Sequence, residues 1–103
     1  MEIYKLKFSV KAYEDLVDIY DYTNDILKNP EGAKKVYKKI KDAIKKLEFL
    51  PKRYPLIKVG EILYNLRLFI IDDYIVFYMV ADDEKIVRVE RILHGASDWS
   101  KQL

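Results

Sequence analysis

Residues 65–99 read NLRLFIIDDYIVFYMVADDEKIVRVERILHGASDW, and this stretch decides the fold. It holds three runs rich in β-branched and aromatic residues, which predict strands at 64–71, 74–81 and 85–93. The acidic joints between them, at 72–73 and 82–84, are typical of hairpin turns. The stretch therefore predicts three consecutive antiparallel strands.

The chain before this stretch predicts one strand and two helices. Residues 3–8 alternate as a strand does, and Ser9 is a typical N-cap for a following helix. The predicted buried stripe of that helix is Tyr13, Leu16, Val17, Tyr20 and Leu27.

Asn29 and Pro30 predict the start of a second helix, which Pro51 ends. Its predicted stripe is Ala33, Val36, Tyr37, Ile40, Ala43, Ile44, Leu47 and Leu50. Residues 51–63 predict a loop, and residues 96–101 a short final turn of helix.

The predicted fold class is therefore α+β, in the order β-α-α-β-β-β. We expect an antiparallel sheet with a two-helix hairpin packed on one face. At 103 residues, positions 1–103 are expected to form a single domain.

Composition excludes several kinds of protein. The chain has no cysteine and one histidine, so disulfides and cysteine-based metal sites are excluded, and we expect neither a metal nor a cofactor. No apolar run approaches the roughly 18 residues of a membrane span, which predicts a cytoplasmic protein without a membrane partner.

Charge is strongly segregated along the chain. Residues 34–58 hold ten basic and two acidic side chains, a net +8, whereas the whole chain is +2. Such a bipolar molecule attracts a polyanion along one edge, although a run of lysines can also simply solvate a helix.

A two-residue turn at 72–73 sets the register of the sheet. It puts Arg67 opposite Tyr78 and predicts that the other face, with Leu66, Leu68, Ile70, Ile75, Phe77 and Met79, is the core. A three-residue turn at 82–84 would then add Arg88 to a row with Arg67 and Tyr78 on the open face. His94 would lie further along that face, and an even-numbered turn would remove both Arg88 and His94 from it.

Three segments in this order carry a resemblance to a known family: LPKRYP at 50–55, NLRLFIIDDYIVFYMV at 65–80 and VERILHGASDW at 89–99. With the predicted fold, they resemble the RelE/ParE superfamily of type II toxins. The resemblance implies a toxin neutralised by a cognate antitoxin. It would act on the ribosome and mRNA as a metal-independent endoribonuclease, or alternatively inhibit DNA gyrase without cleaving RNA. An inactive module that only binds its antitoxin is a third interpretation.

Cleavage of RNA without a metal needs a base, an acid and a cation over the phosphate. The predicted catalytic residues are His94 as the acid and Arg67 as the phosphate-stabilising cation. The base is left open between Glu48 and Glu61. The predicted substrate-binding residues are Arg53, Arg88, Tyr78, Tyr74 and Lys52, helped by lysines of the second helix that hold a nucleic-acid backbone.

Both catalytic candidates have structural alternatives. His94 can cap the end of the last strand, and Arg67 can form a cation-π contact with Tyr78.

Overall fold

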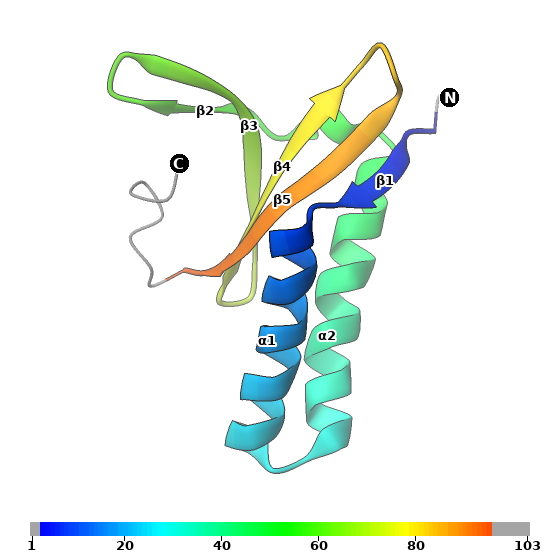
Figure 1. The fold of residues 1–103 in the computed structure, drawn as a ribbon, viewed down its shortest axis with the longest axis vertical. Coiled ribbons are helices and arrows are strands. Elements are labelled where there is room, and N and C mark those ends of the chain that lie inside the picture. The colour runs from blue at the N-terminus through cyan, green and yellow to red at the C-terminus, as the bar shows by residue number, and fades with distance from the viewer. Residues whose placement is uncertain (1–2, 96–103) are drawn as a thin grey trace.

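A computed structural model describes residues 3–95 of the chain (Figure 1). The predicted helical turn at 96–101 lies outside these residues. The elements, in chain order, are β1 (Lys5–Phe8), α1 (Val10–Leu27), α2 (Pro30–Lys45), the short 3-10 helices η1 (Lys46–Glu48) and η2 (Pro51–Arg53), β2 (Leu56–Val59), β3 (Ile62–Ile71), β4 (Tyr74–Ala81) and β5 (Ile86–His94). The predicted α+β class is confirmed.

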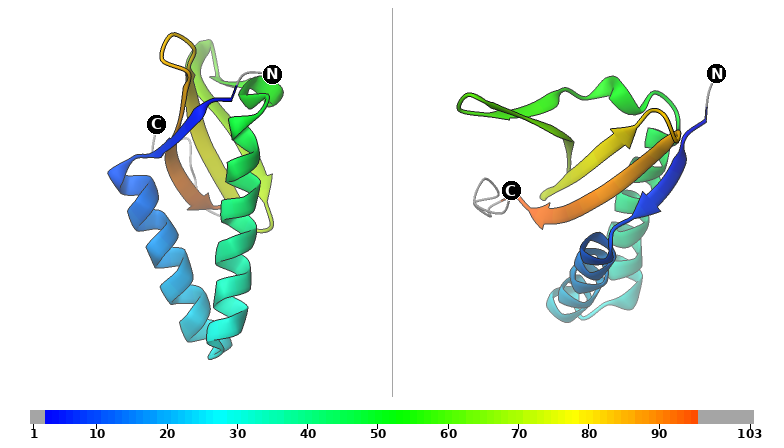
Figure 2. Two further views of the ribbon diagram at one scale, coloured as in Figure 1. Left: turned by 90° about the vertical axis from the view of Figure 1, so that its right-hand side faces the viewer. Right: turned by 45° about the horizontal axis from the view of Figure 1, so that its top comes forward.

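The sheet has the strand order β1-β5-β4-β3-β2. The three predicted strands pair antiparallel as β3, β4 and β5, but β1 runs parallel to β5, so the expectation of a wholly antiparallel sheet is wrong. Parallel neighbours require a long connection between them, and here the helical hairpin and three strands supply it. Figure 2 shows β1 lying along β5 at the top of the hairpin.

Strand β2 occupies part of the segment predicted to be a loop. It pairs antiparallel with β3 through a tight turn at Gly60, whose φ of 60° suits a residue without a side chain. Pro51 and Pro55 before the strand and Gly60 after it favoured a loop, and the four-residue strand is too short to show a clear alternation. β2 and the first half of β3 swing away from β4 and β5 (Figure 1).

Both helices begin at the predicted caps. The Ser9 hydroxyl accepts a hydrogen bond from the Ala12 amide at 3.0 Å, and the Asn29 side chain accepts one from the Glu31 amide at 3.1 Å. These bonds satisfy amides that the first turn of a helix leaves without a partner.

The buried stripe of α1 differs from the predicted one. Ala12, Leu16, Ile19 and Thr23 are buried, whereas Tyr13 and Val17 are 61% and 40% exposed. Adjacent positions on α1 carry two parallel rows of apolar residues, each with helical spacing. Periodicity alone therefore did not distinguish the buried row from the exposed one.

Helix α2 ends at Lys45, earlier than predicted, and the chain continues through η1. Leu50 then adopts the left-handed conformation with φ 50°, and its side chain is 66% exposed instead of buried. The Arg53 guanidinium holds this turn by donating hydrogen bonds to the carbonyl oxygens of Lys46, Phe49 and Leu50.

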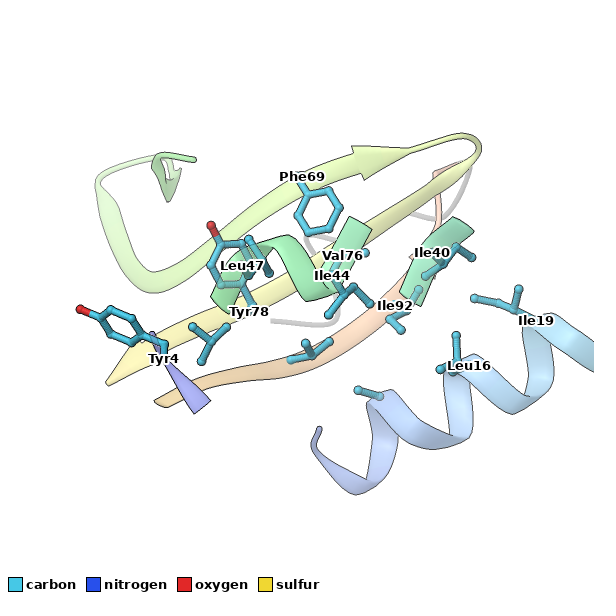
Figure 3. Close-up of a cluster of buried hydrophobic side chains, with 13 residues drawn as sticks. Tyr4, Leu16, Ile19, Ile40, Ile44, Leu47, Phe69, Val76, Tyr78 and Ile92 are labelled. Carbon is cyan, nitrogen blue, oxygen red and sulfur yellow. The ribbon is translucent and has the colours of Figure 1, made fainter. Parts of the chain in front are cut away.

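The main core lies between the helical hairpin and one face of β3, β4 and β5 (Figure 3). Its large members include Leu16, Ile19, Ile40, Ile44, Leu47, Phe69, Val76, Tyr78 and Ile92. Each fully buried aliphatic side chain contributes roughly 1.5–3 kcal/mol to folding. The hairpin therefore covers the face of Tyr78, which was predicted to be open.

A second, smaller cluster lies on the opposite face of the sheet. Ile57 of β2 packs there with Ile75, Phe77 and Leu93, next to Leu66 and Leu68. The prediction that the helices cover this second face is wrong for a physical reason. Both faces of β4 are apolar, so the alternation of apolar and polar residues did not indicate which face the helices cover. Curling of β2 over the second face buries that face as well.

Strand β5 enters the sheet in an unexpected register. Ala81 pairs with Ile86, so four residues form the turn instead of three, and Arg88 lies opposite Met79. A bulge then leaves Glu90 without a direct partner and shifts the remaining pairs by one residue. The predicted row of Arg67, Tyr78 and Arg88 is therefore wrong, because Arg88 is on the other face.

Candidate functional site

Arg67 and Tyr78 pair across β3 and β4, as predicted, but under the helices. Tyr78 is fully buried, and its hydroxyl donates a 2.6 Å hydrogen bond to the Pro51 carbonyl oxygen. Burial raises the pKa of Tyr78 to about 12, although the charge of Arg67 opposes the shift. The Arg67 guanidinium donates a 2.6 Å bond to the Tyr54 carbonyl oxygen.

These contacts tie the segment of η2 to the sheet, and the ring of Tyr54 stacks on Phe69 at 5.1 Å. The cation-π contact with Tyr78, considered above as the structural alternative for Arg67, is not among the ring contacts of the described residues. Arg67 and Tyr78 thus hold backbone carbonyls in this structure.

Lys52 and Arg53, both predicted to bind substrate, are exposed but have protein partners. Lys52 forms an ion pair with Asp82, whose other carboxylate oxygen accepts a 2.9 Å hydrogen bond from Tyr4. The Lys52 ammonium and the Tyr4 hydroxyl lower the pKa of Asp82. Arg53 caps the carbonyls after α2.

His94 lies at the end of β5, paired with Tyr74 of β4. Their rings meet edge to face at 5.7 Å. The two residues line a cleft of about 630 Å³ between the sheet and the helical hairpin, which we call the histidine cleft; its other lining residues are Tyr22, Thr23, Ile26, Val36, Asp72 and Asp73.

The histidine cleft has an acidic rim. Asp72 and Asp73 both line it. The Asp72 carboxylate forms a 2.8 Å ion pair with the Lys39 ammonium of α2. Tyr78, the partner of Arg67, lies four residues from Tyr74 along β4, about 13 Å at the rise of a strand. The structure therefore brings His94 together with Tyr74 and separates both from the Arg67 and Tyr78 pair.

Arg88 lies in a different place again. It lines a groove of about 530 Å³ on the sheet face away from the helices, with Asn65, Met79, Glu90 and Lys11 among its neighbours. Its guanidinium forms an ion pair with Glu90 and approaches the Met79 sulfur at 3.5 Å.

Several residues of the histidine cleft were not foreseen. Tyr22 reaches the cleft because α1 presents a different side to the sheet than predicted. The two apolar rows of α1 are both compatible with a helix that packs on the sheet, so the sequence pattern did not predict which side faces the cleft.

A tight ion pair anchors α1 to β5. Asp15 accepts hydrogen bonds from Arg91 at 2.8 and 3.1 Å and from the Ile92 amide at 2.9 Å.

Within residues 3–95, no helix is long and apolar enough to cross a membrane, and no group of three or more acidic, histidine or cysteine side chains is placed to hold a metal ion.

Comparison with known proteins gives the family. Residues 6–99 match the family described as the ParE toxin of the type II toxin-antitoxin system, parDE. The chain belongs to the ParE toxin family. It is a toxin of a type II toxin-antitoxin system, and the predicted RelE/ParE resemblance is confirmed. A search among curated proteins found no match.

Solved structures resemble this ParE-family toxin over most of their length. A chain of the chromosomal ParDE system from P. aeruginosa is 24% identical with a TM-score of 0.73, covering 89% of this chain and 96% of that one. A chain of the RelBE2 complex from Mycobacterium tuberculosis is 21% identical with a TM-score of 0.63, covering 94% and 97%. A chain of the archaeal RelE-RelB complex from Pyrococcus horikoshii is 17% identical with a TM-score of 0.57, covering 91% and 97%.

Proposed function

We propose that this ParE-family toxin inhibits DNA gyrase by binding it in the cytoplasm, without cleaving RNA, and that a cognate antitoxin neutralises it. The observation that carries the proposal is the separation of the residues assigned to RNA cleavage. His94 and Arg67 belong to different parts of the sheet, and the Arg67 guanidinium already bonds the Tyr54 carbonyl.

The charges of the histidine cleft support the same proposal. An RNA phosphate approaching His94 meets Asp72 and Asp73, and like charges repel it. Lys39 lies by the rim but already pairs with Asp72. Cleavage requires a cation over the phosphorane oxygens, and the lining residues that the structure describes include no lysine or arginine.

The antitoxin is the partner that the family implies. Exposed apolar side chains are available for it on α1, where Val10, Tyr13 and Val17 follow one another at helical spacing and are 76%, 61% and 40% exposed. A partner that covers them removes apolar surface from water.

The decisive experiment measures DNA supercoiling by purified gyrase with increasing amounts of purified toxin. We expect inhibition at near-stoichiometric toxin, retained by His94→Ala within about twofold. Asp83→Asn, an exposed change without a described contact, serves as the matched control. Full supercoiling activity at a large excess of folded toxin would contradict the proposal.

Cleavage of mRNA on the ribosome is the second candidate, because chains of RelBE complexes share this fold and His94 is exposed beside Tyr74. Its test is a purified translation system in which mRNA ends are mapped. Fragments that appear with the wild-type toxin and disappear with His94→Ala would favour this candidate, in which His94 and Arg67 keep their predicted catalytic roles.

A further inference from the structure

Four lysines form a straight row along α2. Lys34, Lys38, Lys41 and Lys45 follow at spacings of four, three and four residues, and all four are exposed. At 100° and 1.5 Å per residue they fall within a sector of about 60° and extend over about 16 Å. We call these four residues the lysine row.

The structure gives three other cations of the basic segment protein partners that the row does not share. Lys39 pairs with Asp72, Lys52 pairs with Asp82, and Arg53 binds backbone carbonyls. Within residues 3–95, the row has no carboxylate within ion-pair distance, and the carboxylates of α2 itself, Glu31 and Asp42, form no ion pair with it. Lys41 lies over the ring of Tyr37 at 5.2 Å, which keeps its ammonium at the surface.

Solvation of the helix does not account for such an arrangement. Lys34 and Lys38, and again Lys41 and Lys45, are like charges one helical turn apart, and each such pair destabilises a helix by roughly 0.2–0.5 kcal/mol. Alternating acidic and basic residues would solvate α2 equally well without repulsion. A row that retains the repulsion is suited to a partner that supplies negative charge.

The surroundings of the row favour nucleic acid as this partner over protein. A protein partner needs apolar anchors among the charges, and none of the exposed large apolar residues identified in the described chain lies on α2. Bases of a single strand stack on exposed aromatic rings, and the one aromatic residue of α2, Tyr37, is half-buried and lies under Lys41. A line of lysines supplies positive charge but cannot recognise bases. Such a line is suited to a nucleic acid that it contacts through the phosphates alone.

We propose that the lysine row binds the phosphate backbone of duplex DNA without sequence preference. The choice of DNA as the nucleic acid rests on the proposed function, because gyrase, the enzyme that we propose the toxin inhibits, acts on DNA. The toxin would then hold gyrase and its DNA together, with α2 against the duplex.

The acidic face of α1 would set the orientation of the bound molecule. Glu14, Asp18, Asp21 and Asp25 are exposed on α1. They repel phosphates from that helix over about one Debye length, roughly 10 Å at 0.1 M salt. The bipolar hairpin therefore presents α2, and not α1, to DNA.

The test is fluorescence anisotropy with a labelled 20-base-pair duplex and purified toxin between 50 and 300 mM KCl. Each phosphate contact contributes about 0.9 to the slope of log affinity against log salt. We expect the variant K34Q/K38Q/K41Q/K45Q to reduce that slope by about 3 to 4. The variant K34R/K38R/K41R/K45R, which keeps the charge, should retain it.

The matched control is K5Q/K7Q/K11Q/K58Q, which removes the same charge from exposed lysines outside α2. It should change the slope by less than about 1. Equal slopes for the row variant and this control would overturn the inference. Tighter binding of a single-stranded RNA of equal length than of the duplex would also overturn it. Tighter binding of polyglutamate than of the duplex would overturn it too, and would indicate an acidic protein partner.

Circular dichroism checks that each variant is folded. Gyrase supercoiling measured on the same proteins keeps the two proposals apart. Duplex binding that depends on the row, without gyrase inhibition, would overturn the proposed function alone. Gyrase inhibition with duplex binding unaffected by the row variant would overturn this inference alone.

Discussion

The hydroxyl of Tyr78, at the centre of β4, donates a 2.6 Å hydrogen bond to the carbonyl oxygen of Pro51. This bond crosses the main core and joins the sheet to η2, the segment that carries Lys52 and Arg53. Both partners are buried, so neither group can exchange the bond for one with water. Tyr78 therefore determines where the basic turn after α2 lies.

Replacing Tyr78 with Phe should destabilise the protein by about 1–2 kcal/mol, because a buried carbonyl loses its donor while the ring still fills its place. Urea unfolding measures the change. Tyr22→Phe, at a tyrosine that is 64% exposed, should stay within about 0.5 kcal/mol of the wild type. Equal effects of the two substitutions would contradict this role.

Stability at alkaline pH should depend on Tyr78. Its pKa is raised to about 12 by burial, and an unfolded tyrosine titrates near 10, so the unfolded chain releases its proton first. The stabilisation by the neutral phenol is complete below pH 10 and is lost as the pH rises toward 12. Unfolding free energies at pH 8–12 should fall more steeply for the wild type than for Tyr78→Phe, by roughly 2–3 kcal/mol in total. Parallel curves would argue against it.

Asp82 should affect stability in acid. Its pKa is lowered by Lys52 and Tyr4, so the folded chain binds this proton less readily than the unfolded chain does. The stabilisation is present above about pH 4 and is lost as the pH falls through the lowered pKa. Asp82→Asn should flatten the acid limb of the stability curve, measured by urea unfolding at pH 2–6. Asp83→Asn, its exposed neighbour, should leave the limb unchanged.

Truncation of Asp15 should detach α1 from β5. The carboxylate binds the Arg91 guanidinium and the Ile92 amide, and it is only 14% exposed. Asp15→Ala leaves both donors without their acceptor and should destabilise the protein by about 2 kcal/mol. Asp18→Ala, at an exposed position on the same helix, is the control in the same urea titration.

A side chain at Gly95 should strain the backbone where β5 ends. Its amide donates a 2.7 Å hydrogen bond to the Asp73 carbonyl oxygen, and an added Cβ would lie 3.2 Å from that oxygen. Gly95→Val should therefore strain the end of the β4–β5 pair and destabilise the protein by about 1 kcal/mol. Hydrogen exchange of the Tyr74 and His94 amides reports the local loosening, and unchanged exchange would contradict the prediction.

Much of the fold followed from local chemistry. The capping side chains of Ser9 and Asn29 start the helices, and the two-residue turn at 72–73 pairs Arg67 with Tyr78 as expected. These features depend on residues close together in the sequence, where hydrogen-bonding capacity and turn length leave few alternatives. The order of motifs was enough to indicate the family.

The candidate site was less predictable, because its geometry depends on long-range packing. Both faces of β4 are apolar, so only the docking of the helical hairpin determines that Tyr78 is buried. The four-residue turn and the bulge at Glu90 determine that Arg88 and His94 lie on opposite faces.

The sequence by itself determined the helical starts, the first hairpin register and the concentration of positive charge between residues 34 and 58. Only the tertiary structure decided which of those cations have partners. Asp72 and Asp82 reach Lys39 and Lys52 from turns far along the chain, and the lysine row has no such neighbour among the described residues. Ion pairs form between groups that folding brings together, whatever their separation in sequence.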